Sequence, residues 1–499
     1  MLTMKKIFII LTAAWSALSA FSSAPVLSPA PSAGNVNVDT RLSIMFDSDV
    51  TLGDKGMIRI IDAETDICVD SLDLSIPAGP TESTKLPKPP YTLRPYIYDQ
   101  PRQTNRTAKP GTPSGTAAPT TDEYQLTIIG GFTDGFHFYP VITDGRKAEI
   151  YPHNNMLDYG HTYYVTVDPE VFSTSKGRFK GISKKDGWRF SVRPSAPSAE
   201  NRRLIVAADG SGDFNTLQGA MDFIPDFNDD HWTVFIKNGN YEELVYFRNK
   251  RNVTIEGESR DGVYVHYANN EVFNPHPDDV STNEWLGTFP SRRAAFMMDN
   301  CTGMVLRNFT VATTLVGQAE GLLIMGERNQ VLDVTIKGSG DALQVNGSTY
   351  FDNCVIEGHG DSVLGRGPSF FKNCTLKSRN AFVWIRNTAS SHGNVFVGCT
   401  FIGIGNRSVL ARTNDKYPHS EMVLIDCRLD NVPSEGWSGI DKDNCDYIHY
   451  WEFGSTDLNG SPVDFSKRAY GSRRLDPVAD KAIIDAYRNP AFVLGWKPE

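Results

Sequence analysis

The sequence feature that most constrains the fold is a short β-like segment that recurs between residues 309 and 429. Neighbouring copies are 25, 20, 20, 25 and 28 residues apart, and Gly and Asn are frequent between them. The copies are Phe309-Thr310-Val311, Val334-Thr335-Ile336, Cys354-Val355-Ile356, Cys374-Thr375-Leu376, Cys399-Thr400-Phe401 and Cys427-Arg428-Leu429. A second strand-like segment follows in most repeats, as in 342–345 and 362–364. Short strands with this period are typical of a β-solenoid, in which each repeat forms one coil.

Two other repeat architectures fit the sequence less well. A leucine-rich horseshoe has a similar period, but its Leu-rich consensus and its helices are missing from this chain. A propeller blade needs about twice the period. The sequence therefore predicts an all-β fold whose larger part, residues 201–499, is a right-handed parallel β-helix.

The remaining chain is long enough for a second unit, because 499 residues exceed one ordinary domain. Strand-like segments such as 57–61 and 163–167 predict a smaller β-sandwich over residues 25–197. Its opening residues, Ser28-Pro29-Ala30-Pro31 and Val38-Asp39-Thr40-Arg41-Leu42, resemble bacterial immunoglobulin-like modules. We therefore expect an immunoglobulin-like accessory domain before the β-helix.

Residues 1–24 have the pattern of a signal peptide. Lys5 and Lys6 precede an apolar run, and Ser22-Ser23-Ala24 offers small residues for cleavage. The run is too short for a membrane span, and no other candidate span follows it. We expect an exported protein, periplasmic, at the cell surface or extracellular, with no membrane span in the mature chain.

Charge and cysteine usage limit the partners and cofactors. A formal net charge of -10, without a basic stripe, argues against a nucleic-acid partner. Four cysteines, at 354, 374, 399 and 427, share one position of the repeat, which favours buried free thiols over disulfides. No His or Cys ligand cluster is recognisable, so no metal cofactor is expected.

Two aspartates fall at the same position of consecutive repeats. Asp341 and Asp361 each lie five residues after the second apolar residue of their segment, beyond a Gly-containing turn. If each repeat is one coil, the two carboxylates are about 4.8 Å apart, one strand spacing. Two carboxylic acids at so short a distance do not both ionise easily, so the pKa of one of them is raised. A single aspartate in a turn usually points into solvent or caps a backbone N–H group. Two aspartates stacked on consecutive coils destabilise the β-helix by charge repulsion, so their presence indicates a function.

An ordered series of blocks over residues 204–499 resembles the pectin methylesterase family, whose members are right-handed β-helices. The blocks are Asp209-Gly210-Ser211-Gly212-Asp213-Phe214, Ile236-Lys237-Asn238-Gly239-Asn240-Tyr241, Asn252-Val253-Thr254-Ile255-Glu256-Gly257, Gly317-Gln318-Ala319, Gly340-Asp341-Ala342-Leu343 and Gly360-Asp361-Ser362-Val363-Leu364-Gly365. The resemblance implies that the chain binds pectin (homogalacturonan) and hydrolyses its galacturonate methyl esters. It also implies a covalent intermediate and no cofactor.

The resemblance further implies roles for four residues. Asp361 falls on the family's nucleophile, Asp341 on its general acid/base and Gln318 on a glutamine that supports the oxyanion. Arg412, in Leu410-Ala411-Arg412, falls on the catalytic arginine block. Its planar guanidinium can hold a carboxylate with two hydrogen bonds and lower its pKa.

The repeat register alone does not select Arg412 among three arginines. Arg366, Arg386 and Arg412 each come five residues after the position equivalent to Asp341 in their repeat, which predicts a ladder. We expect Arg366 and Arg386 to bind uronate carboxylates. The alternative is a solvated edge paired with surface acids.

Aromatic residues near the expected groove are candidates for stacking on sugar rings. They are Trp384, Tyr417, Trp437 and Trp451. Burial of Trp384 is nearly as well supported as exposure, because Trp384 lies beside Ile385. Trp437 is the preferred candidate, because Glu435-Gly436-Trp437 resembles a family Gly-Trp block.

Two positions depart from the family pattern, which usually has Gln at the place of Gly340 and Trp at the place of Asn414. An esterase acting on another pectic or uronate ester therefore stays open, as does a noncatalytic pectin-binding β-helix. A polysaccharide lyase would need an acidic cluster for Ca²⁺. An inverting glycosidase would need carboxylates farther apart than one coil allows.

Overall fold

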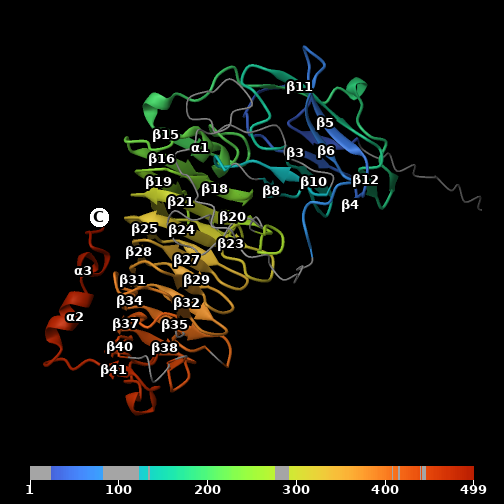
Figure 1. The fold of residues 1–499 in the computed structure, drawn as a ribbon. Coiled ribbons are helices and arrows are strands. Elements are labelled where there is room, and N and C mark those ends of the chain that lie inside the picture. The colour runs from blue at the N-terminus through green and yellow to red at the C-terminus, as the bar shows by residue number, and fades with distance from the viewer. Residues whose placement is uncertain are drawn as a thin grey trace, which may run out of the picture.

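The computed structural model describes residues 24–81, 123–132, 135–275, 291–406, 408–413, 416–438, 440 and 446–499. The predicted signal peptide up to residue 23, Asn414 and Cys445 lie outside these ranges. A long stack of parallel strands forms the body of the molecule, and smaller sheets lie beside its first coils (Figure 1). Within the described ranges, no helix is long and apolar enough to cross a membrane.

Three parallel sheets form the stack, with strand orders that step from one coil to the next. The first sheet contains β15 (Arg203–Val206), β16 (Trp232–Ile236), β19 (Val253–Gly257), β22 (Val305–Arg307), β25 (Asn329–Leu332), β28 (Thr349–Asp352), β31 (Ser369–Lys372), β34 (Asn394–Val397), β37 (Glu421–Ile425), β40 (His449–Phe453) and β41 (Ser472–Arg474). The second contains β17 (Gly239–Glu242), β20 (Val263–Tyr267), β23 (Thr310–Thr313), β26 (Thr335–Lys337), β29 (Val355–Glu357), β32 (Thr375–Ser378), β35 (Thr400–Gly403) and β38 (Arg428–Asp430). The third contains β18 (Val245–Arg248), β21 (Phe296–Thr302), β24 (Leu322–Glu327), β27 (Leu343–Asn346), β30 (Val363–Gly365), β33 (Val383–Ile385), β36 (Ala411–Arg412) and β39 (Trp437–Ser438). The predicted β-helix is confirmed.

The repeat that is visible in the sequence is the second sheet. Thr335 pairs with Val355, and Val355 pairs with Thr375, so the predicted segments stack in register. The first sheet was not predicted, because only two residues separate most of its strands from the next strand of the second sheet. Asn353 and Asn373 are the first residues of two of these turns, with φ of 52° and 54°. Asn tolerates this left-handed conformation, so one residue is enough to turn the chain.

The interior of the coils is filled by stacked apolar side chains. Phe351, Phe371 and Phe396 stack on one another with ring centroids 4.5 Å apart at each step. The cysteines of the repeat also lie in this core, and the six cysteines within the described residues are all free. The prediction of buried free thiols is confirmed for the four repeat cysteines, whereas Cys68 is exposed.

The N-terminal region forms separate small sheets that are mostly antiparallel. They are β1 (Val26–Ser28), β3 (Leu42–Met45), β10 (Lys147–Ile150) and β9 (Val141–Asp144); β2 (Ala33–Val36), β14 (Arg189–Val192), β11 (Thr162–Val167), β5 (Met57–Asp62) and β6 (Cys68–Asp73); β13 (Gly177–Arg178), β12 (Phe172–Thr174) and β4 (Val50–Leu52); and β7 (Leu126–Thr127) with β8 (Phe136–His137). The immunoglobulin-like assignment of this region stays a prediction.

The two regions are joined at the start of helix α1 (Leu217–Phe223). Asp39 of the N-terminal region accepts hydrogen bonds from the backbone N–H groups of Asn215 and Thr216, at 3.0 and 2.8 Å. Glu243 accepts from those of Leu217 and Gln218. These carboxylates satisfy donors that a helix leaves unpaired at its N-terminus. At the other end of the chain, α2 (Lys481–Tyr487) and α3 (Pro490–Leu494) lie along one side of the stack (Figure 1).

Candidate active site

The two repeat aspartates occupy equivalent places on adjacent coils. Leu343 of β27 pairs with Val363 of β30, and each aspartate lies two residues before its paired residue. The predicted register of Asp341 and Asp361 is therefore confirmed. Asp361 has a φ of 48°, a left-handed conformation that is uncommon outside glycine and is often found at functional sites.

Asp361 is held by Arg412 of β36 through both carboxylate oxygens. Arg412 Nε donates to Asp361 Oδ1 at 2.7 Å, and Arg412 Nη2 donates to Oδ2. The hydrogen bond to Asp361 raises the pKa of Arg412. Trp384 lies against the same guanidinium, whose central carbon is 4.2 Å from the ring centroid. A two-point contact of this kind is stronger than hydrogen bonds between neutral groups and fixes the orientation of the carboxylate.

Asp341 lies in a different electrostatic environment. Burial raises its pKa to about 8, with a further increase from the charge of Glu320 and a smaller one from Asp361. Arg293 acts in the opposite direction, since its Nη2 lies 3.3 Å from Asp341 Oδ2. The sequence predicted that one acid of the pair would have a raised pKa, and Asp341 is that acid. The main cause, however, is burial rather than the neighbouring aspartate.

Arg293 and Glu320 are residues of the site that the sequence reasoning missed. Arg293 Nε donates to both oxygens of Glu320, at 2.8 and 2.9 Å, and Glu320 is fully buried. Arg293 Nη1 also donates to Gln318 Oε1 at 2.6 Å. A signal for Glu320 was available, because an acid two residues before the apolar run 322–325 is costly to bury without a partner. Arg293 precedes β21, outside the recognised repeats, and no pattern marked it.

Gln318 is exposed and lies next to the aspartate pair through Arg293. Because the guanidinium holds its carbonyl oxygen, its amide N–H groups are the end directed away from Arg293. Gly340, directly before Asp341, has no room for a side chain. A Cβ placed there would lie 2.0 Å from the carbonyl oxygen of Gly317. The backbone therefore explains why no glutamine side chain stands at this place.

The predicted arginine ladder is partly wrong. Arg366 and Arg386 follow the paired residues Gly365 and Ile385, so these two share a position. Arg412 instead pairs with Trp384, two residues earlier in the register. The long connection before β36 shifts the strand, which begins at Ala411 rather than at Ser408. Arg412 is thereby set opposite Asp361 instead of in line with the other arginines.

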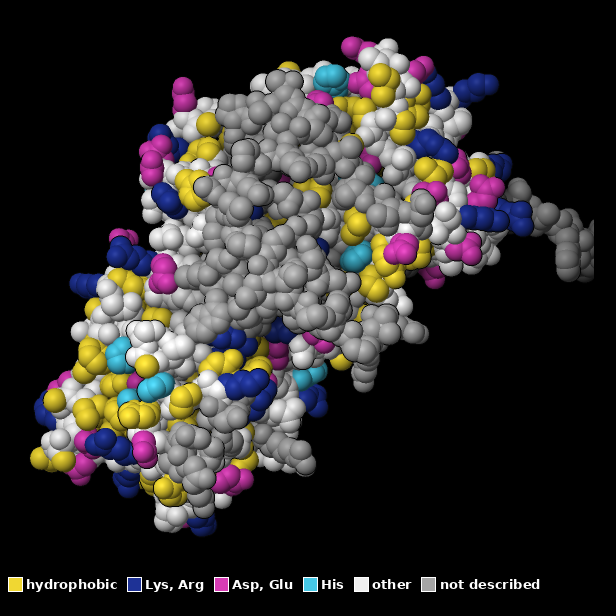
Figure 2. Space-filling view, in the orientation of Figure 1, with side chains coloured by type: hydrophobic (Ala, Val, Ile, Leu, Met, Phe, Trp, Pro, Cys, Tyr) yellow, Lys and Arg dark blue, Asp and Glu magenta, His cyan; other side chains and the backbone are white. Residues whose placement is uncertain are grey.

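Of the other predicted substrate-binding residues, Arg386 and Trp384 lie together beside Arg412, and Arg366 lies against Tyr417, whereas Trp437 and Trp451 lie elsewhere. Arg386 is buried with its guanidinium carbon 4.7 Å from the Trp384 ring, and Arg366 lies 5.7 Å from the ring of Tyr417. Figure 2 shows basic and acidic side chains side by side below the grey band. Trp384 is half-buried.

The preferred aromatic candidate, Trp437, does not line the groove. It is 1% exposed, belongs to the interior core and stacks on Tyr450 at 4.5 Å. The prediction that Trp437 stacks on a sugar ring is therefore wrong, because its place in β39 directs the ring into the coil. Trp451 is also elsewhere, on the first sheet against His449.

Comparison with known proteins agrees with this geometry. The family model described as Pectinesterase matches residues 203–470, more than half of the chain. The chain belongs to the pectinesterase family. This is a family of carboxylic ester hydrolases, and the matched residues include both aspartates, Gln318 and Arg412.

Individual pectinesterases are distant relatives. Pectinesterase QRT1 of Arabidopsis thaliana is 29% identical over 186 residues, which is 35% of this chain and 47% of that protein. Probable pectinesterase 8 of the same plant is 24% identical over 309 residues, 58% of this chain and 75% of the relative. The chain thus spans less than half of the first relative's length. The carrot pectin methylesterase structure shares the fold, with a TM-score of 0.50 and 20% identity over 58% of this chain and 92% of that chain.

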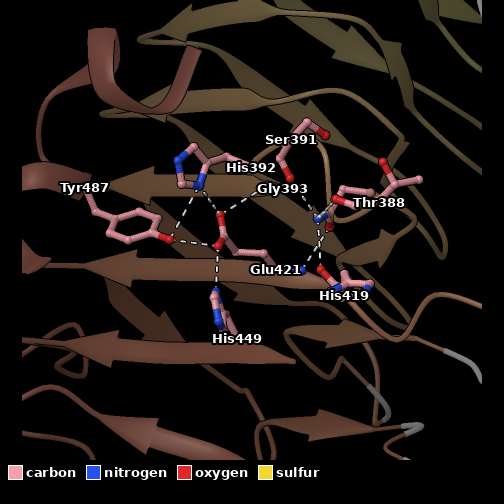
Figure 3. Close-up of polar contacts among 9 residues, drawn as sticks. Thr388, Ser391, His392, Gly393, His419, Glu421, His449 and Tyr487 are labelled. Atoms are coloured by element: carbon pink, nitrogen blue, oxygen red, sulfur yellow. Dashed lines mark hydrogen bonds and ion pairs between the residues drawn. The ribbon is translucent and has the colours of Figure 1, made fainter. Parts of the chain in front are cut away.

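A second buried carboxylate of this pectinesterase-family chain lies on the first sheet (Figure 3). Glu421 Oε1 lies 2.9 Å from His392 Nδ1, and Glu421 Oε2 lies 2.7 Å from His449 Nδ1. The hydroxyl of Tyr487, in α2, donates to Oε2 at 2.7 Å. Tyr487 lies beyond the residues that the family model matches, so this contact ties the C-terminal helices to the family fold.

Proposed function

We propose that the chain is a pectin methylesterase, which hydrolyses the methyl esters of galacturonate units in pectin and releases methanol. The observation that carries this proposal is the contrast between the two aspartates. Asp361 is paired with Arg412 through both oxygens, which suits an ionised nucleophile, and Asp341 has a pKa of about 8, which suits a proton donor at neutral pH.

The first half of the reaction forms a covalent intermediate. A carboxylate oxygen of Asp361 attacks the ester carbonyl carbon and gives a tetrahedral oxyanion. Asp341 then donates its proton to the methoxy oxygen as the carbon–oxygen bond breaks, so that methanol leaves. Asp361 is now joined to the galacturonyl group as an acyl anhydride, and Asp341 is ionised.

The second half restores the enzyme. Asp341 takes a proton from a water molecule, whose oxygen attacks the acyl carbon. The bond to Asp361 breaks, which gives the galacturonic acid carboxyl group and returns Asp361 as a carboxylate paired with Arg412. The second proton of the water leaves the new carboxyl group for the solvent, which gives the free galacturonate carboxylate. Gln318 is assigned to stabilise the oxyanion, since its amide end is turned away from Arg293.

Substrate binding is assigned to the arginines and aromatic residues around the aspartates. Arg366 and Arg386 would pair with galacturonate carboxylates, and Trp384 and Tyr417 would contact sugar rings. Pectin is therefore the proposed partner. An exported protein is the proposed location, because pectin is an extracellular polymer and residues 1–24 have the pattern of a signal peptide.

The test is methanol release from highly methylated pectin by the wild-type chain and by Asp361→Ala. The wild type should release methanol, and the variant should lose at least about 1000-fold in rate. A variant that releases methanol at the wild-type rate would sink the assignment. A second activity, on another pectic ester such as an acetyl ester of a sugar hydroxyl, is favoured by the lack of room for a side chain at Gly340. Measuring acetate beside methanol across several pectic fractions separates the two.

A further inference from the structure

A cavity of about 550 Å³ lies where the C-terminal helices pack beside the first sheet. Glu421 of β37 and His449 of β40 line it from the sheet, and Tyr487 of α2 and Phe492 of α3 line it from the helices. The aspartate pair of the candidate active site is not among its described lining residues. The cavity is open to solvent, since Phe492 and Tyr447, another lining residue, are 46% and 62% exposed.

Two histidines in this cavity have fixed orientations, because each contacts Glu421 through Nδ1 (Figure 3). They are His392 and His449, and their rings lie on opposite sides of the carboxylate. An ionised carboxylate only accepts hydrogen bonds, so Nδ1 of each ring carries the hydrogen. The other ring nitrogen, Nε2, accepts a hydrogen bond when the ring is neutral and donates one when the ring is protonated. The two side chains are 29% and 36% exposed, which leaves both rings within reach of a ligand.

The other lining residues combine hydroxyl groups with aromatic faces. Ser390 and Ser391 supply hydroxyl groups, and Tyr447 supplies an exposed ring whose centroid is 4.9 Å from that of His419. A sugar suits such a lining, because its hydroxyl groups donate and accept hydrogen bonds and its ring packs on an aromatic face. Among the described lining residues, none is Lys or Arg and Glu421 is the one acid. A ligand carboxylate finds no cation there, so an uncharged saccharide fits better than an anionic one.

The cavity adjoins residues that are assigned to substrate binding. Asn387, in its lining, directly follows Arg386, which lies against the Trp384 ring. His419, also in the lining, comes two residues after Tyr417, another of the assigned residues. Three residues of extended chain span at most about 11 Å, so the backbone of Asn387 lies within that distance of the backbone of Trp384. A saccharide in the cavity is therefore a near neighbour of one bound beside Trp384.

We propose that this cavity is a second saccharide site, which binds methyl-esterified galacturonate units of pectin and disfavours units that carry a free carboxylate. This inference rests on the proposed function, because that function converts one kind of unit into the other. His392 and His449 bind sugar hydroxyl groups through Nε2, and Tyr447 packs on the sugar ring. Glu421 holds the two imidazoles in place. The site keeps the enzyme on stretches of polymer that are still esterified, since a stretch that has lost its esters binds more weakly.

The first experiment follows the histidine rings directly by NMR. The protein is Asp361→Ala, labelled at histidine Cε1, so that the probe, fully methyl-esterified trigalacturonate at neutral pH, stays esterified. We expect the ring signals of His392 and His449 to shift and to saturate. The matched control is His161, which is 48% exposed and also contacts a buried acid, Asp62, through Nδ1 at 2.8 Å, and its signal should stay in place. Signals of His392 and His449 that do not move, or that move together with that of His161, overturn the proposal.

A second titration tests the preference for uncharged units. Trigalacturonate with free carboxylates replaces the esterified trimer, at the same pH and with the same histidine signals. We expect a dissociation constant at least about tenfold higher, because its carboxylates meet no Lys or Arg among the described lining residues. Equal dissociation constants for the two trimers overturn the preference for esterified units.

A third experiment replaces an exposed side chain of the cavity, so that the core is not disturbed. Tyr447→Ala should raise the dissociation constant of the esterified trimer about three- to tenfold, because an aromatic face is lost. Tyr470→Ala is the matched control, since Tyr470 is 60% exposed and is not among the described lining residues, and it should change nothing. An unchanged constant for Tyr447→Ala overturns the role of that ring. Methanol release by the wild type without any shift of the His392 and His449 signals overturns the second site alone, whereas no methanol overturns the proposed function.

Discussion

Asp341 and Glu421 both have largely buried carboxyl groups in the same β-helix, with side chains 14% and 7% exposed, yet their pKa values differ widely. Burial raises the pKa of Asp341 to about 8. Burial also acts to raise the pKa of Glu421, but hydrogen bonds from His392, His449 and Tyr487 outweigh it and lower that pKa to about 2 (Figure 3). The comparison distinguishes a buried acid that stays protonated near neutral pH from one that is ionised.

The difference lies in the donors that surround each carboxylate. Glu421 receives two histidine contacts, the Tyr487 hydroxyl and the backbone N–H of Gly393 at 3.2 Å. Asp341 contacts Arg293 only at 3.3 Å, and the same guanidinium is bonded to both oxygens of Glu320. A buried carboxylate that accepts hydrogen bonds from several donors stabilises the fold in its ionised form. A buried carboxyl group with few donors instead stays protonated and can transfer that proton.

The largest expected effect is loss of turnover on changing Asp341, the proposed proton donor. Asp341→Asn keeps the shape of the side chain but cannot donate and then accept a proton. We expect kcat for methanol release to fall about 100- to 10,000-fold, the range that general acid–base catalysis contributes. Thermal unfolding should show no loss of stability, since a buried carboxyl is removed. A variant with wild-type kcat, or with lower stability and unchanged kcat, would contradict the assigned role.

For the matching change at Glu421 we expect the opposite result, a loss of stability with no loss of turnover. Glu421→Gln removes the charge that His392 and His449 contact, and we expect a loss of about 2–3 kcal/mol in the free energy of unfolding near neutral pH. Methanol release by the folded protein should be unchanged, because Glu421 lies on the first sheet and Asp341 precedes a strand of the third. Urea denaturation monitored by tryptophan fluorescence measures the difference.

The direction in which the stability contributed by Glu421 changes with pH follows from the lowered pKa of this residue. A carboxyl whose pKa falls on folding contributes stability that is present above its unfolded value, 4.5, and is lost as the pH falls toward about 2. The stability difference between wild type and Glu421→Gln should therefore shrink across that interval. A difference that stays constant down to pH 2 would show that the charge of Glu421 is not the cause.

The sequence was sufficient to predict those residues of the site whose positions depend on the register of the repeat. Asp341 and Asp361 were predicted together because strand pairing carries one position to the next coil. Register did not locate Arg412, because the connection before β36 is longer than in the preceding coils and the strand starts later than the pattern indicated. Trp437 was misplaced because a motif identifies a position without showing which way its side chain points.

Arg293 and Glu320 were missed for a different physical reason. Their pairing joins two coils through side chains 27 residues apart, and no periodic pattern encodes such a contact. The first sheet was missed because single left-handed residues such as Asn353 make the turn so short that two strands read as one segment. The packing of Phe132 and Phe136 on Tyr246 of the third sheet could not be predicted either, because it depends on how the N-terminal region folds against the stack.

A smaller effect, on pH dependence, is expected from the anion beside Asp341. Glu320 raises the pKa of Asp341, so Glu320→Gln should lower that pKa and move the alkaline decline of kcat, expected near pH 8 in the wild type, to lower pH. The matched control is Glu256→Gln, since Glu256 pairs with Arg307 at 2.9 Å on the first sheet. An alkaline limb that is identical in wild type and Glu320→Gln would argue against electrostatic control by Glu320.

The smallest expected effect is on the contact between Tyr487 and Glu421. Tyr487→Phe removes one of several donors and keeps the ring, so the free energy of unfolding should fall by about 1 kcal/mol, less than for Glu421→Gln. Tyr350→Phe is a matched control, because its hydroxyl donates at 2.9 Å to Asp352, a more exposed carboxylate, and its loss should cost less. If Tyr487→Phe costs as much as Glu421→Gln, the stability of this cluster comes from docking of α2 rather than from the number of donors. Hydrogen exchange separates these cases, since loss of docking would expose the amides of α2 while those of β37 stay protected.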